Sequence, residues 1–80
     1  MDLYPALRSA ALKYVPLDRA DELARNLAQE IELDHNACRY ENMRLRVDYR
    51  VSTFGLQCDA HALTVALWQA GFRALCEVRR

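Results

Sequence analysis

The stretch MRLRVDYRVS, residues 43–52, decides the fold that we predict for this chain of 80 residues. Its apolar residues alternate strictly with polar ones, and they are Met43, Leu45, Val47, Tyr49 and Val51. Since successive side chains of a strand point to opposite faces of a sheet, this alternation is typical of a half-buried β-strand. We therefore predict a strand here, with its polar face open to solvent.

Two helices are predicted before this strand. Residues 2–15 place apolar side chains at helical intervals, and Pro16 ends that helix because the residue before a proline avoids the α region. A second helix begins at Asp18 and reaches at least Leu33, with apolar residues at every fourth position from Leu23. Its continuation through His35 and Cys38 is left open.

A third helix and a second strand are predicted after residue 52. Gly55 ends the first strand, and residues 60–70 form a helix with Asp59 or Cys58 as its N-cap and Gly71 at its end. Residues 72–79 then alternate again, which predicts the second strand.

The predicted fold class is therefore α+β, in a single compact domain spanning residues 1–80. The element order is α-α-β-α-β, with helices packed on one face of a two- or three-stranded sheet. The strand, helix, strand unit is long enough for a right-handed parallel crossover. A third strand just before Met43, or a second copy of the chain in a homodimer, would complete the sheet.

The predicted strands carry a row of arginines on their polar face: Arg44, Arg46, Arg50, Arg73 and Arg79. Such a row is either a solvated sheet face or a surface for an acidic partner, held by bidentate arginine–carboxylate contacts. Trp68 points away from the apolar side of the third helix, so it is either buried between layers or an interface anchor. These arginines and Trp68 are the candidate partner-binding residues.

The pairs HNAC and CDAH bracket the first predicted strand and contain ligand types of a structural zinc site: His35, Cys38, Cys58 and His61. Neither pair has the glycine of a usual zinc knuckle, and Cys38 continues an apolar helix stripe. Cys58 lies at a predicted helix N-terminus, but no phosphate loop or orienting group accompanies it. We therefore expect no metal, no cofactor and no catalytic residue, and we keep those four residues as a candidate metal set.

Composition points to a cytoplasmic protein. No apolar run approaches the ~20 residues that span a bilayer, and the N-terminus lacks the organisation of a signal peptide. Three cysteines without a secretion signal favour reduced thiols. The net charge is zero, which gives no general reason to expect nucleic acid, although acidic residues concentrate in 1–42 and basic residues in 43–80.

A compact, arginine-rich domain of this size without an enzymatic motif resembles the small phage- or prophage-encoded inhibitors of bacterial defence, including anti-CRISPR proteins. The resemblance is one of size and character, so it transfers no functional residue. It implies a non-catalytic protein in the bacterial host cell that binds a larger protein or ribonucleoprotein complex and blocks DNA access or nuclease recruitment. The alternative is a small nucleic-acid-binding regulatory module that uses the arginine-lined sheet face.

Overall fold

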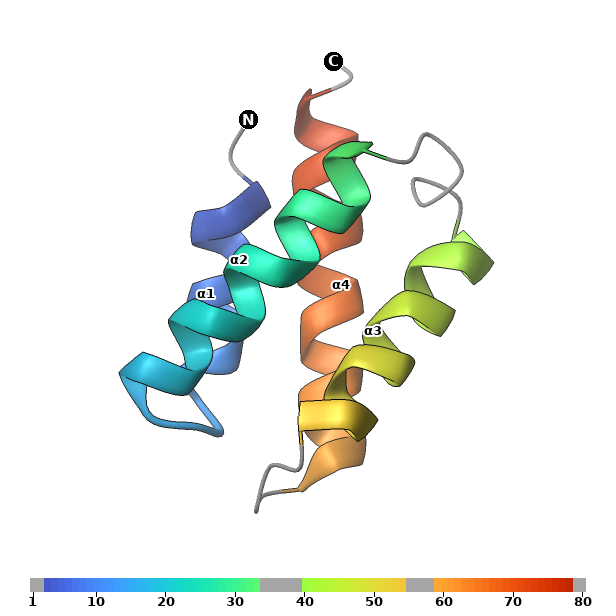
Figure 1. Cartoon of the computed structure of the whole chain (residues 1–80). Helices are drawn as coiled ribbons and strands as arrows, with labels where there is room; N and C mark the ends of the chain where they lie inside the picture. The colour runs from blue at the N-terminus through green and yellow to red at the C-terminus, as the bar shows by residue number, and fades with distance from the viewer. Residues whose placement is uncertain (1–2, 34–39, 55–58, 79–80) are drawn as a thin grey trace.

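The computed structural model describes residues 3–33, 40–54 and 59–78, and within these ranges it contains helices and no strand. The helices, in chain order, are α1 (Leu3–Ala11), α2 (Leu17–Leu33), α3 (Tyr40–Phe54) and α4 (Ala60–Val78). The described part of the chain is an all-α fold (Figure 1). The predicted α+β fold with a sheet is therefore wrong.

Helix α3 occupies the place of the first predicted strand, residues 43–52. Met43, Val47 and Val51 are buried, with at most 4% of each side chain exposed, whereas Leu45 and Tyr49 are each 67% exposed. Positions four apart share one side of a helix, while positions two apart, at about 100° per residue, point in nearly opposite directions. Every second one of the alternating apolar residues also lies on one face of a helix. The alternation therefore does not distinguish a strand from a helix here.

Helix α4 runs through Gly71 and includes residues 72–78 of the second predicted strand. The sequence after Gly71 is rich in helix-forming arginine, alanine, leucine and glutamate, and no proline follows. Gly71 is buried, and a Cβ at this position would lie 3.4 Å from Met43 Sδ and 3.5 Å from Leu7 Cδ2. The glycine marks the close approach of α1 and α3 to α4, and it does not end the helix as predicted.

The start of α4 and the two N-terminal helices agree better with the predictions. The backbone N–H of Ala62 donates to Asp59 Oδ1 at 3.1 Å, so Asp59 is the N-cap of α4, one of the two residues predicted for that role. Helix α2 begins at Leu17, beside the predicted start, and α1 ends at Ala11, earlier than predicted. The continuation of α2 to Cys38 lies outside the described residues.

The four described helices pack in a ring in which each one contacts two others. Helix α4 packs against α1 on one side and α3 on the other, α1 also packs against α2, and the contact between α2 and α3 is the smallest of these (Figure 1). All four helices contribute to one core, whose largest fully buried side chains are Leu3, Leu7, Leu23, Leu27, Ile31, Met43, Val47, Leu63 and Leu67. The Cα radius of gyration, 11.2 Å, is close to the ~11.6 Å of a compact chain of this length.

Two arginines strengthen the small contact between α2 and α3. Arg19 Nη2 donates to the carbonyl oxygen of Phe54 at 2.9 Å, and the guanidinium carbon lies 4.8 Å from the centre of the Phe54 ring. Phe54 is the last residue of α3, so Arg19 pairs one of the carbonyls that a helix end leaves without an intrahelical partner. Further along, Arg50 of α3 forms a partly buried ion pair with Glu30 of α2.

Candidate functional site

Two large apolar side chains project from α3 on the side opposite its buried residues. Leu45 and Tyr49 are one helical turn apart and each is 67% exposed, which makes them the most exposed of the large apolar residues that the structure describes. Single exposed apolar residues are ordinary, but neighbouring ones on one helix face are typical of a binding surface. We call this pair, Leu45 and Tyr49, the α3 face.

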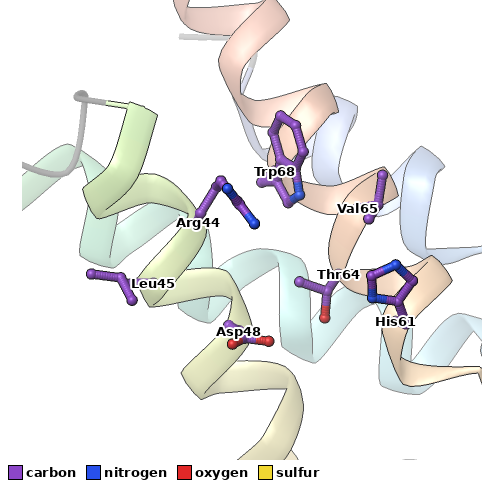
Figure 2. A pocket seen from close by; sticks show the side chains of 7 residues that line it. All are labelled: Arg44, Leu45, Asp48, His61, Thr64, Val65 and Trp68. Carbon is purple, nitrogen blue, oxygen red and sulfur yellow. The ribbon is translucent and has the colours of Figure 1, made fainter.

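A groove of about 430 Å³ adjoins the α3 face, between α3 and α4. Figure 2 shows the side chains that line it: Arg44, Leu45, Asp48, His61, Thr64, Val65 and Trp68. The first three come from α3 and the others from α4. We call it the α3–α4 groove.

Arg44 and Trp68 meet across the α3–α4 groove. The guanidinium carbon of Arg44 lies 5.5 Å from the centre of the Trp68 ring, within the ~6 Å range of a cation–π interaction. The half-buried Trp68 also packs against the hydrophobic core, so its ring offers Arg44 a fixed platform (Figure 2). Asp48 follows Arg44 by one turn and is exposed. The α3 wall of the groove therefore carries a cation and an anion one turn apart.

Three groups able to take part in proton transfer line the groove: Asp48, His61 and Thr64. His61 is exposed in the first turn of α4, and among the described residues no hydrogen bond joins it to Asp48. No serine or cysteine lines the groove, and Thr64 lies about one turn after His61 in α4, with no hydrogen bond between these two side chains among the described residues. An exposed apolar pair beside a stacked arginine and tryptophan is suited to binding.

The predicted row of arginines does not form, because the described residues contain no sheet. On a helix these residues point in different directions: Arg44 borders the α3–α4 groove, Arg50 pairs with Glu30, and Arg46 is half-buried and engaged within the chain. Arg73 of α4 is exposed and borders a second groove, of about 460 Å³, between α1 and α4. The fifth predicted residue, Arg79, lies outside the described residues.

The sequence left open whether Trp68 is buried between layers or exposed as an interface anchor, and the structure shows an intermediate position. One side of its ring packs against the core and the other borders the groove, so it is neither fully buried nor fully exposed. Of the five candidate partner-binding residues that the structure describes, Arg44 and Trp68 are brought together.

Of the candidate metal set, only His61 lies among the described residues. The part of the chain that the structure describes holds no group of three or more metal-binding side chains. The other three residues of the set, His35, Cys38 and Cys58, lie outside the described residues.

A polar cluster that the sequence did not reveal joins α1 to α2. The hydroxyl of Tyr4 donates to Asp21 Oδ1, and Arg25 Nε donates to Asp21 Oδ2 at 2.8 Å. The guanidinium carbons of Arg8 and Arg25 lie 5.4 and 5.3 Å from the centre of the Tyr4 ring. The hydrogen bond from Tyr4, followed by that from Arg25, lowers the pKa of Asp21 below its ordinary value. Sequence spacing shows the Asp21–Arg25 pair, but the part of Tyr4 depends on how α1 packs against α2.

Comparisons with protein-family models, curated proteins and solved structures find no match for this chain. Among the described helices, none is both long enough and apolar enough to cross a membrane.

Proposed function

We propose that this chain is a non-catalytic, cytoplasmic binding domain that acts by contact with another protein through the α3 face and the α3–α4 groove. The exposure of Leu45 and Tyr49 carries the proposal. Burying a large apolar side chain contributes about 1.5–3 kcal/mol, so a helix that only covered the core would gain nothing by holding two of them in water. A partner that covers both recovers that free energy.

The surroundings of the α3 face support a protein as the partner. Tyrosine, tryptophan and arginine are the residue types that dominate binding energy in protein interfaces. Trp68 and Arg44 line the groove together with Leu45, and the exposed Tyr49 follows Leu45 by one turn of α3. Trp68 and Arg44 hold each other in place before a partner arrives, which reduces the conformational entropy lost on binding.

Two functions expected from the sequence are not part of this proposal. The nucleic-acid alternative required an arginine-lined sheet face, and the described residues contain no sheet. The resemblance to phage-encoded inhibitors implied a non-catalytic protein that binds a larger protein or ribonucleoprotein complex. It rests on size and character and names no residue of the α3 face, and the comparisons neither support nor contradict an anti-CRISPR identity.

Affinity capture with matched surface variants tests the proposal. The tagged chain is expected to retain a specific protein from cells of its source, and the double variant Leu45→Glu with Tyr49→Glu is expected to lose it. Leu17→Glu is the control, because Leu17 is 61% exposed at the start of α2, away from the α3 face. The captured protein is then purified and titrated against each variant by calorimetry. Equal binding by all three forms would contradict the proposal.

A further inference from the structure

We infer that the α3 face binds a second copy of this chain, through an antiparallel, two-fold symmetric contact between the two α3 helices. The inference rests on the proposed function, because it names the partner of the same face. Its basis is that the exposed side of α3 is complementary to itself when one copy is reversed.

The complementarity follows from two pairs of residues at the same spacing. Leu45 and Tyr49 form the centre of the exposed side, and Arg44 and Asp48 lie along the flank that borders the α3–α4 groove. A two-fold axis perpendicular to two antiparallel helices keeps each flank on its own side and reverses its order. When the axis passes between residues 46 and 47, Leu45 of one copy lies opposite Tyr49 of the other, and Arg44 lies opposite Asp48. In each case the two residues differ in position by about 1.5 Å along the helix axis.

The contact therefore joins unlike charges and apolar side chains at the same time. Leu45 of each copy meets Tyr49 of the other, and Arg44 of each meets Asp48 of the other, so every favourable contact occurs twice. A parallel two-fold arrangement would instead bring this flank against the opposite flank of the other copy, so that Arg44 would lie beside Arg46. The charges thus select the antiparallel arrangement and set its register.

Both charged residues of this flank are exposed. Asp48 is exposed, and within the described part of the chain it has no hydrogen bond or ion pair. Arg44 is exposed, and its guanidinium carbon lies 5.5 Å from the centre of the Trp68 ring at the wall of the α3–α4 groove. The opposite flank carries Arg46, which is half-buried and engaged within its own chain.

The dimer is expected to be weak and reversible. A contact between two helices of 15 residues lies at the small end of specific interfaces, below about 1,200 Å² in total. Interfaces of that size belong to transient complexes, so we expect a dissociation constant on the order of micromolar. Self-association should then depend on protein concentration in the range of ordinary biophysical measurements.

Charge reversal tests the inference on the intact chain. Analytical ultracentrifugation is expected to show monomer converting to dimer as the wild-type concentration rises through the micromolar range. Arg44→Asp and Asp48→Arg each place like charges opposite one another, so each alone should weaken self-association at least about tenfold. An equimolar mixture of the two variants restores both unlike pairs and should form a heterodimer. Both positions are exposed, and circular dichroism will confirm that the helices are retained.

Each remaining outcome contradicts the inference. A wild-type chain that stays monomeric up to millimolar concentration would overturn it, as would single variants that still dimerise or a mixture that does not. If the chain is monomeric while the Leu45→Glu, Tyr49→Glu variant loses a different captured protein, the second-copy inference fails and the proposed function stands. If neither self-association nor capture depends on the α3 face, both fail. The Leu17→Glu variant should dimerise like the wild type.

Discussion

At the scale of single residues, Gly71 lies where three helices meet. Replacing it with alanine should stabilise the fold by about 0.5–1 kcal/mol, because glycine in a helix interior has an entropic cost that alanine avoids. The added methyl group would make ordinary contacts with Met43 and Leu7. Thermal denaturation would then show a rise of several degrees for a domain of this size.

Gly71→Leu is the matched control for that measurement. A leucine side chain has no room between α1, α3 and α4, so this variant should lower the melting temperature. A fall on Gly71→Ala as well would mean that the helices approach one another more closely than the structure indicates.

The stability of the fold also depends on pH through a single residue, Asp21. Because the folded state lowers its pKa, ionised Asp21 stabilises the fold above the ordinary value of 3.8, and this contribution is lost as pH falls through the lowered pKa. Tyr4→Phe removes the largest cause and should move the pKa of Asp21 back toward its ordinary value. Carboxylate NMR titration of the wild type and Tyr4→Phe measures this directly, and an unchanged pKa would count against the Tyr4 hydrogen bond.

At the scale of elements, variants of α3 test whether its alternating apolar residues belong to a helix or to a strand. Val47→Lys should destabilise the fold by at least about 3 kcal/mol, because it places a charge in the core. Leu45→Lys should change stability by no more than about 0.5 kcal/mol, because that side chain faces solvent. Urea denaturation at low protein concentration checks both variants. Equal, large losses would indicate that both residues are buried, as in the predicted strand.

The same helix shows why only part of the fold was predictable from sequence. In α2, Leu23, Leu27 and Ile31 recur every four residues without an alternating set between them, so the helical period is unambiguous. In α3 the apolar residues at every second position fit both the two-residue period of a strand and the 3.6-residue period of a helix. Intrinsic preference does not decide between them, because leucine, methionine and arginine favour helix while valine and tyrosine favour strand. The position of Gly71 then made the end of α4 resemble a separate element.

Individual residues of the candidate site could be predicted from the sequence, but their arrangement in space could not. Arg44 and Trp68 were both named from sequence, Trp68 because it lies off the apolar side of its helix. Their stacking depends on the packing of α3 against α4, which joins residues far apart in the chain. Tyr49 was assigned to a buried sheet face, so its place on the binding surface could not be inferred before α3 was known to be a helix.

The end of α3 depends on a residue of another helix. Arg19→Ala should cost about 1 kcal/mol, because Phe54 loses both a charged hydrogen bond to its carbonyl and a cation–π contact in a partly exposed setting. Arg19→Lys keeps the charge without the planar group and should recover only part of this loss. Chemical denaturation of the three proteins gives the comparison, and a fully stable Arg19→Ala variant would show that the cap contributes nothing.

At the scale of the whole molecule, the packing is uneven. Helix α4 has large contacts with both α1 and α3, whereas α3 has one large contact, with α4, and a small one with α2. Amide hydrogen exchange at low protein concentration should therefore be slowest around Leu63 and Leu67 in α4 and faster along α3. Exchange followed by NMR tests this order. Slowest exchange in α3 would mean that this helix is anchored more firmly than its contacts suggest.

The exposed pair on α3 also links the stability of the monomer to the chain's own concentration. A second copy that covers Leu45 and Tyr49 binds only while α3 is folded, so association adds to the free energy of unfolding by mass action. The melting temperature should then rise with protein concentration, and it should cease to do so in the Leu45→Glu, Tyr49→Glu variant. The helix with the smallest support inside the molecule would in this way gain its support from outside it.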